Sequence, residues 1–153
     1  YHTALRIVAS APDAEDVIQE SFVKVFQQLH TFRGEASIGS WIKRIVVNTA
    51  LNHLRGKKKL PFVDLPALPD QPDEPAEDEP AWDARAIHEA IKKLPEGSRV
   101  VFTLFAVEDM GHKDIARELG ITESTSKTQY MRARRMLQQH LRAMQPQFLN
   151  QHW

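Results

Sequence analysis

The chain contains no cysteine among its 153 residues. This absence excludes a disulfide framework, a zinc site built on thiolates, an iron–sulfur cluster and a cysteine nucleophile. It is compatible with a reducing compartment. Long apolar runs are also missing, since none approaches the roughly 20 residues that a membrane span needs. We therefore expect no direct membrane insertion.

Motifs of common enzyme classes are missing too. No two histidines stand three or four residues apart, and the sequence has no HExxH, GxxxxGK[ST], GxGxxG or GxSxG motif. Asp16 and Glu20 are four residues apart, but no histidine or second carboxylate pair matches them. We predict no catalytic residue, no metal site and no cofactor, because no group of residues supplies base, nucleophile and stabiliser together.

The beginning of the chain lacks the features of a leader peptide. Its first ten residues, YHTALRIVAS, contain only a short apolar stretch, and Arg6 interrupts it. The chain also lacks an initiator methionine. We expect that further residues precede Tyr1 in the natural protein.

A net charge of zero argues against nucleic-acid binding only if the charge is evenly spread. It is not: residues 1–60 carry +4, residues 61–83 carry −8 and residues 84–153 carry +4. Six of the nine prolines also lie between Pro61 and Pro80. Proline removes a backbone donor and like charges extend a chain, so this segment is predicted to be a linker. The sequence thus predicts two basic lobes and an acidic connector.

The predicted fold class is all-α, with two small helical domains joined by an extended acidic, proline-rich linker. The predicted boundaries are 1–60 for the first domain, 61–83 for the linker, 84–145 for the second domain and 146–153 for a tail. Each domain has a size at which a single core is marginal. We expect both to gain stability from a partner.

The first lobe begins with the end of a helix over residues 1–10. Asp13 is predicted to cap a second helix over 14–29. Its expected inward residues follow helical spacing: Ile18, Phe22, Val25, Phe26 and Leu29. The opposite side carries Asp16, Gln19, Glu20 and Val23. That side is either a solvated face or a docking face for a basic helix of a partner.

A loop over 30–40 is expected to lead into a third helix over 41–54. Its expected inward residues are Ile42, Ile45, Val46, Thr49 and His53. Its polar stripe consists of Arg44, Asn48, Asn52 and Arg55, and three lysines follow at 57–59. Cations, amides and Trp41 suit a nucleic-acid strand. The alternative is a solvated amphipathic helix with Trp41 in the core.

The second lobe has the pattern of a helix-turn-helix. Asp83 is predicted to cap a helix over 84–94, and a further helix spans 96–107. The expected inward residues of these two are Ile87, Ala90, Ile91, Leu94, Val100, Val101, Leu104 and Phe105. A short helix over 112–119 then ends at Gly120, which supplies the positive φ of a tight turn. Thr122 is predicted to cap the last helix.

The last helix is predicted to be the recognition helix of this motif. Its expected inward residues are Ser126, Tyr130, Ala133, Leu137 and Leu141. Its outward residues are Ser124, Lys127, Thr128, Met131, Arg132 and Arg135. The first of them suit the major groove and the later arginines suit phosphate. The alternative is a basic surface helix of a plain α-bundle.

Two blocks of the sequence resemble one known family. DAEDVIQESFVKVFQQLHTFRGEASIGSWIKRIVVNTALNHLRGKKK resembles the second region of bacterial sigma factors of the extracytoplasmic-function (ECF) group. LPEGSRVVFTLFAVEDMGHKDIARELGITESTSKTQYMRARRMLQQHL resembles their fourth region. The two blocks stand in the family's order, with a variable linker between them. In the second block Ser126 stands where many members have valine, and STSKTQ is similar to the start of this helix in a subset of the family.

The resemblance implies a sigma factor that joins core RNA polymerase and directs promoter recognition, promoter melting and transcription initiation. By resemblance, a helix of the first block binds the largest catalytic subunits of the polymerase through Asp16, Gln19, Glu20 and Phe22. The −10 element is implied to contact Phe32, Arg33, Ser37, Ile38, Trp41, Arg44, Asn48 and Arg55, which trap a flipped base. The −35 element is implied to contact Ser124, Lys127, Thr128, Met131, Arg132 and Arg135.

The resemblance also implies partners. An anti-sigma factor, often linked to the membrane in this family, is expected to hold the protein inactive. The free protein is expected to be a cytoplasmic monomer, associated with the nucleoid or held at the inner membrane face by that regulator. The linker is implied to thread a basic channel of the polymerase, against the alternative of a simple tether. Two other functions stay open: an autonomous helix-turn-helix regulator, and an adaptor that binds only proteins.

Overall fold

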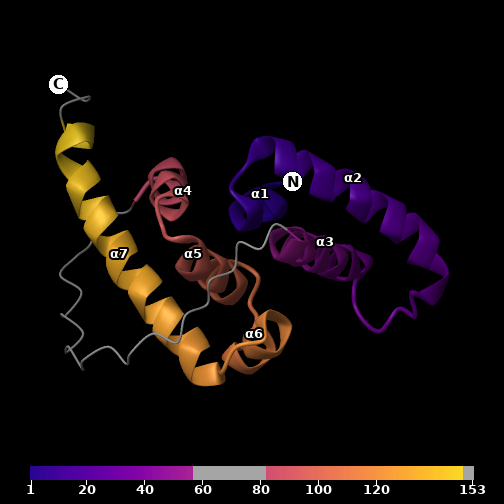
Figure 1. The fold of residues 1–153 in the computed structure, drawn as a ribbon. Helices are drawn as coiled ribbons and strands as arrows, with labels where there is room; N and C mark the ends of the chain where they lie inside the picture. Colours follow the sequence, from indigo (N-terminus) through magenta and orange to yellow (C-terminus); the bar gives the residue numbers. More distant parts are fainter. Residues whose placement is uncertain (57–81, 150–153) are drawn as a thin grey trace. The chain divides into compact units, whose positions relative to one another are not determined.

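The computed structural model describes the backbone of residues 1–56 and 82–149, and the side chains of residues 1–56 and 82–144. The chain divides into two compact units, residues 1–61 and 62–153. All the regular elements in the described ranges are helices, as an all-α fold predicts (Figure 1). The lysines at 57–59 and the predicted linker up to residue 81 lie outside the described residues.

The first unit contains four helical segments: α1 His2–Val8, α2 Ala11–Gln28, the short 3₁₀ helix η1 Leu29–Thr31 and α3 Ile38–Gly56. The three α-helices pack against one another in pairs. Ile7 of α1, Val17 of α2 and Leu51 of α3 are fully buried. These side chains form a core to which each of the three helices contributes one face.

The predicted start of α2 is wrong. Ser10 is the N-cap, and its Oγ accepts a hydrogen bond from the backbone N–H of Asp13 at 3.4 Å. Pro12 lies inside the first turn, where proline is tolerated because a backbone N–H there has no partner within the helix. Asp13 therefore does not cap the helix. Its Oδ1 lies 3.3 Å from Nε2 of His53 on α3.

The predicted inward face of α2 is also wrong in part. The buried residues are Ala14, Val17, Ser21 and Val25. Of the predicted set only Val25 is buried, whereas the side chains of Phe22, Phe26 and Leu29 are 55%, 75% and 47% exposed. The helix carries apolar residues on two sides, and helical periodicity alone does not say which side meets the core. Small residues on the buried side let the helices approach closely.

Helix α3 begins at Ile38, earlier than predicted. Oγ of Ser37 accepts a hydrogen bond from the backbone N–H of Ser40 at 3.2 Å, which caps the first turn. The buried residues of α3 are Val47, Thr49, Ala50, Leu51 and Leu54. Thr49 is the confirmed member of the predicted set. The other predicted residues, Ile42, Ile45, Val46 and His53, are half-buried.

The second unit contains α4 Ala84–Lys92, α5 Glu96–Phe102, the π-helical turn η2 Thr103–Val107, α6 His112–Leu119 and α7 Glu123–Leu149. Asp83 caps α4 as predicted, with its Oδ1 3.3 Å from the backbone nitrogen of Arg85. Helices α4, α5 and α6 all pack on α7. Helix α7 continues past the boundary at 145 that the sequence predicts for this domain.

The core of the second unit follows the predicted pattern closely. The confirmed buried residues of α4 and α5 with their flanking segments are Ala90, Ile91, Leu94, Val100, Val101 and Leu104. Phe105 is half-buried. Ile87 is the exception, because its side chain is 38% exposed and Ala86 occupies the buried position of that turn. On α7, Ser126, Ala133 and Leu137 are buried as predicted, and Tyr130 and Leu141 are half-buried.

None of the helices in residues 1–56 and 82–149 combines the length and the hydrophobicity of a membrane span.

Candidate functional site

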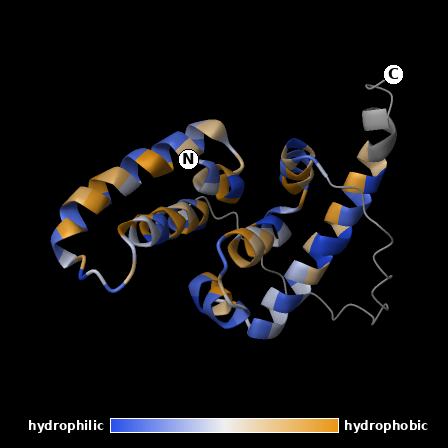
Figure 2. Cartoon of the chain, turned by 180° about the vertical axis from the view of Figure 1, so that it is seen from behind, coloured by the Kyte–Doolittle hydropathy of each residue, from blue (hydrophilic) through white to orange (hydrophobic). Residues whose placement is uncertain are grey.

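The first candidate surface is the side of α2 that faces away from α3. Asp16, Gln19, Glu20 and Phe22 are all exposed there. Val23, which the sequence places on this side, and Phe26, which it predicts to face inward, are 55% and 75% exposed on the same helix. Hydrophobic and hydrophilic residues alternate along the whole of α2 (Figure 2). We call the six residues the α2 face.

The α2 face combines two kinds of group that fit a protein partner. Its aromatic and aliphatic side chains offer apolar area, and its carboxylates offer charge. Glu20 Oε1 lies 3.1 Å from Nζ of Lys24, one helical turn further along. An apolar patch with a polar rim is the usual composition of a protein interface.

The second candidate surface begins at the loop between η1 and α3. The rings of Phe32 and Trp41 pack against each other, with centroids 5.4 Å apart and planes tilted by 50°. Arg33, Ser37 and Ile38 are exposed beside them. The ring pair anchors the start of the loop to α3, so the exposed residues of the loop extend from a fixed point.

The polar stripe of α3 continues this surface. Arg44, Asn52 and Arg55 are exposed and Asn48 is half-buried. Nη1 of Arg55 donates a hydrogen bond to Oδ1 of Asn52 at 2.8 Å. The stripe lies outside the buried set of α3, as the sequence predicts. The structure thus places the predicted residues of this site in the loop and along one helix.

The third candidate surface is the helix-turn-helix of α6 and α7. Gly120 has a φ of 66°, and the backbone N–H groups of Gly120 and Ile121 both donate to the carbonyl of Ala116. Oγ1 of Thr122 accepts a hydrogen bond from the backbone N–H of Thr125 at 3.0 Å. Both predicted turn signals are therefore confirmed, and together they fix the angle at which α7 leaves the turn.

The predicted reading residues of α7 all lie outside its buried set. Ser124 and Lys127 are exposed, and Thr128, Met131, Arg132 and Arg135 are half-buried. Nζ of Lys127 lies 3.6 Å from Oε1 of Glu123. The exposed polar residues stand in the first turn and a half of the helix and the arginines follow. This order places hydrogen-bonding groups first and cations further along.

The buried side of α7 carries polar contacts that the sequence analysis missed. Ser126 is fully buried, and its Oγ lies 2.9 Å from Nδ1 of His112 on α6. Gln129 is 4% exposed, and its Oε1 accepts a hydrogen bond from Oγ of Ser98 on α5 at 2.8 Å. One signal was present in the sequence: Ser126 lies on the inward stripe, and a buried hydroxyl requires a partner.

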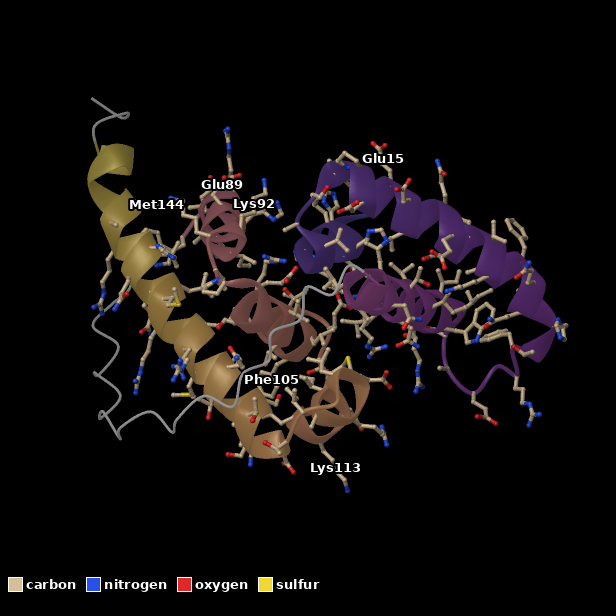
Figure 3. The ribbon with its side chains drawn as sticks, in the orientation of Figure 1. Glu15, Glu89, Lys92, Phe105, Lys113 and Met144 are labelled. Carbon is tan, nitrogen blue, oxygen red and sulfur yellow. The ribbon has the colours of Figure 1, made fainter. Side chains whose placement is uncertain are left out.

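The ring of His112 is held on two sides. It stacks on Phe105, with centroids 4.2 Å apart and planes at 13°, and its edge meets Tyr130 at 5.8 Å. Figure 3 shows Phe105 in the region where α5, α6 and α7 meet, while Lys113, the next residue after His112, projects outward from α6. Burial lowers the pKa of His112 from 6.5, the charge of Lys127 lowers it further and Glu123 acts in the opposite direction.

Arg99 on α5 is a second buried ionisable group without a predicted role. Its side chain is 8% exposed and its Nη2 lies 3.8 Å from Oε1 of Glu96. Burial lowers the pKa of Arg99, and Glu96 acts in the opposite direction. Within the described ranges, no group of three histidine or carboxylate side chains is placed to hold a metal ion.

The sequence matches two family descriptions in the predicted order. The family described as Sigma-70 region 2 matches residues 1–60, and the family described as Sigma-70, region 4 matches residues 84–137. The first match covers the helices of the first unit, the second runs from the start of α4 into α7, and residues 61–83 lie in neither.

Several curated proteins are similar to most of the chain. The RNA polymerase sigma-H factor of Pseudomonas aeruginosa is 30% identical over 93% of this chain and 78% of its own length. The ECF RNA polymerase sigma factor SigM of Mycobacterium tuberculosis is 31% identical over 89% of this chain and 68% of its own. The RNA polymerase sigma factor SigV of Bacillus subtilis is 31% identical over 90% and 81%.

Solved structures with the same fold include a sigma factor bound to its regulator. It is the sigma factor RpoE of Bartonella quintana, in a co-crystal with the anti-sigma factor NepR. The TM-score is 0.59, the sequence identity is 20%, and the match covers 92% of this chain and 88% of that one.

Proposed function

Because this chain belongs to the ECF group of RNA polymerase sigma factors, we propose that its two units divide the work of promoter recognition between them. The observation that carries this proposal is the presence of three separate candidate surfaces. The α2 face and the α3 stripe belong to the first unit, and the recognition helix belongs to the second. Domain boundaries of 1–60 and 84–145, with a linker between them, fit this division.

In this proposal the α2 face docks on core RNA polymerase. Asp16, Gln19, Glu20 and Phe22 form the contact, and the exposed ring of Phe26 adds to it. Phe22 and Phe26 expose large apolar side chains that the unit's own core does not use. An aromatic side chain that becomes buried on binding is a typical source of interface energy. The exposure of these rings therefore supports docking over a merely solvated face.

The first unit also binds and opens the −10 element in this proposal. Arg33 and Arg44 contact phosphate, Asn48 contacts base edges, and Phe32 with Trp41 supports an unpaired base beside Ser37 and Ile38. Arg55 extends the same stripe. A flipped base costs a few kcal/mol, and least where the duplex is already open. An aromatic corner beside a row of cations suits an unpaired strand.

The second unit reads the −35 element. The side chains of Ser124, Lys127 and Thr128 enter the major groove, and Met131, Arg132 and Arg135 follow along the helix. Major-groove base edges distinguish all four base pairs, so a helix in that groove reads sequence directly. The −35 and −10 contacts belong to different units in this proposal, and a linker between the units lets each unit bind its own promoter element.

Regulation by an anti-sigma factor and a cytoplasmic location are part of the same proposal. The expected regulator covers the polymerase-facing surfaces and can hold the sigma factor at the inner membrane face, whereas the released protein associates with the nucleoid. The protein itself performs no catalysis, since it directs an enzyme. A pull-down from cells tests this part: recovery of a regulatory protein besides the core subunits supports it, and recovery of the core subunits alone contradicts it.

Reconstitution tests the proposal as a whole. Core RNA polymerase plus this protein is expected to start transcription from a selected promoter, whereas neither component does so alone. Lack of binding to core polymerase would overturn the proposal. An autonomous regulator would instead bind duplex DNA tightly by itself, usually as a dimer on a palindrome. A protein-only adaptor would keep its activity after substitution of Lys127 and Arg132.

A further inference from the structure

Two polar pairs hold the recognition helix α7 on the rest of its unit, and the α7 member of each pair is buried. Ser126 pairs with His112 of α6 at 2.9 Å, and Gln129 pairs with Ser98 of α5 at 2.8 Å. Ser126 is fully buried, and Ser98 and Gln129 are 5% and 4% exposed. Ser126 and Gln129 are three residues apart, so they lie on one side of α7. Lys127 and Thr128, between them in sequence, belong to the reading set.

The direction of these contacts distinguishes them from the apolar packing nearby. Apolar contacts are not directional and tolerate small rotations of a helix. A hydrogen bond weakens steeply when its angle falls below about 120°. A rotation of α7 by about 10° would move side chains at a radius of about 6 Å by about 1 Å. That shift is enough to misplace both polar pairs and the reading residues together.

Breaking one of these hydrogen-bonded pairs costs more free energy than a small displacement of apolar side chains against each other. A buried polar group that loses its partner shifts the equilibrium away from that arrangement by about 5- to 150-fold. The two pairs connect α7 to two different helices. A rotation of α7 away from the observed orientation therefore cannot preserve both hydrogen bonds. The stack of His112 on Phe105 holds the imidazole while its Nδ1 meets Ser126. The ring is thus fixed by packing and its nitrogen by hydrogen bonding.

We propose that His112 is a positioning residue for −35 recognition, which acts with Ser126, and with Ser98 and Gln129 as a second pair, to set the rotation of α7. None of the four touches DNA in this assignment. They determine how Ser124, Lys127 and Thr128 are presented to base edges. This inference rests on the proposed function, since it assigns a cause to the sequence readout of that same helix.

The test compares sequence discrimination with overall DNA binding. Holoenzyme made from core polymerase and the full chain selects its preferred −35 hexamer from a randomised library beside a fixed −10 element. Binding to that hexamer is then compared with binding to each single-base variant. A well-read base pair contributes about 1–3 kcal/mol, which corresponds to about 5- to 150-fold discrimination.

His112→Phe and Ser126→Ala separate the hydrogen bond from the packing. Phenylalanine keeps a ring on Phe105 but removes Nδ1, and alanine removes only the hydroxyl of Ser126. We expect each variant to lower discrimination by about tenfold. The two effects should not add in the double variant, because either change breaks the same pair. The salt dependence of non-specific DNA binding should stay unchanged.

His30→Phe is the matched control, because it makes the same chemical change at an exposed position of the other unit. It should leave −35 discrimination as it is. Unchanged discrimination in both His112→Phe and Ser126→Ala would overturn the positioning role. A loss of specific and non-specific binding in equal measure would also overturn it, because that result is a loss of folded protein. A wild-type holoenzyme that selects no −35 hexamer would overturn the proposed function itself.

Discussion

The ring of Phe32 rests against the ring of Trp41, and this contact ties the start of an exposed loop to α3. The loop carries Arg33 and Ser37, and Ile38 begins α3 directly after it; all three belong to the proposed −10 site. An aromatic pair of this kind contributes about 0.5–1.5 kcal/mol beyond its buried area. The contact between Phe32 and Trp41 therefore helps to hold the DNA-binding residues of the loop in position.

Phe32→Ala should therefore reduce promoter opening. The loss of the ring pair releases the loop, and about 1 kcal/mol corresponds to roughly a fivefold decrease. Permanganate reactivity of unpaired thymines in the holoenzyme complex measures opening. Phe32→Tyr keeps the ring pair and is the matched control. Equal opening by the alanine and tyrosine variants would contradict the role of this contact.

Phe26→Ala should weaken binding to core polymerase without unfolding the protein. Its side chain is 75% exposed, so its removal should change the stability of the first unit by less than about 0.5 kcal/mol. An interface aromatic contributes about 2 kcal/mol or more, so the affinity should fall by at least about 30-fold. Titration of labelled protein with core polymerase gives the affinity.

Val17→Ala is the opposite case on the same helix. Val17 is fully buried, so its truncation should destabilise the first unit by about 2 kcal/mol. Its effect on polymerase affinity should be small under conditions in which the unit stays folded. Hydrogen exchange of α2 and α3 amides follows stability in both variants. A stable Phe26→Ala variant with wild-type affinity would remove Phe26 from the docking surface.

Lys127→Ala with Arg132→Ala should lower promoter affinity and its dependence on salt. A phosphate contact contributes about 0.9 to the slope of log affinity against log salt concentration, so the loss of Arg132, the phosphate contact of the two, should reduce the slope by about 1. Affinity is measured for holoenzyme over a salt series. The control is Lys92→Ala on α4, an exposed cation 3.3 Å from Glu89 (Figure 3). A slope that falls equally in the control would contradict the assignment.

Gly120→Ala should destabilise the helix-turn-helix by about 1–2 kcal/mol. The φ of Gly120 is 66°, and a left-handed backbone costs an L-residue about this amount. No atom lies within 4 Å of a Cβ added there, so the cost is conformational and not steric. Asparagine tolerates this region, so Gly120→Asn should recover part of the loss.

Gly39→Ala should have the opposite sign. Gly39 lies in the first turn of α3 without a positive φ, and no atom lies within 4 Å of an added Cβ. Alanine has a helix propensity about 1 kcal/mol better than glycine. Hydrogen exchange of α3 amides should slow in this variant, whereas that of α6 and α7 should accelerate in Gly120→Ala. If both alanine substitutions stabilised the protein, or both destabilised it, the backbone conformation assigned to one of the two glycines would be wrong.

The second unit should lose stability as the pH falls below about 6.5. Burial is the main cause that lowers the pKa of His112 in the folded state from its ordinary value of 6.5. Below pH 6.5 His112 therefore binds a proton more readily in the unfolded chain than in the folded unit. The contribution of His112 to the free energy of unfolding is fully present above pH 6.5 and decreases as the pH falls toward the folded pKa.

Urea unfolding at several pH values measures this effect, with the ring resonances of Tyr130 as the probe of the second unit. His112→Phe removes the titrating group and should flatten the profile between pH 6.5 and the folded pKa. Lys127 also lowers the pKa of His112, and Glu123 acts in the opposite direction. A profile of equal steepness in wild type and His112→Phe would assign the dependence to another group.

The helix-turn-helix was predictable from local sequence. Gly120, Thr122 and Asp83 each act through the backbone of their own turn, so their roles do not depend on distant residues. The all-helical class and the recognition helix followed from helical spacing for the same reason. The domain boundaries and the roles of the individual DNA and polymerase residues remain predictions, and the acidic linker lies largely outside the described residues.

The sequence alone determined which segments are helical, how positive and negative charge are distributed along the chain, and which family the two blocks resemble. Only the tertiary structure decided which side of α2 is buried. That helix carries apolar residues on both sides, and the close approach of α3 selects the side with Ala14 and Ser21 and leaves Phe22 and Phe26 exposed. The tertiary structure also decided the partners of Ser126 and Gln129, because a hydrogen bond between helices depends on distances that no local pattern encodes.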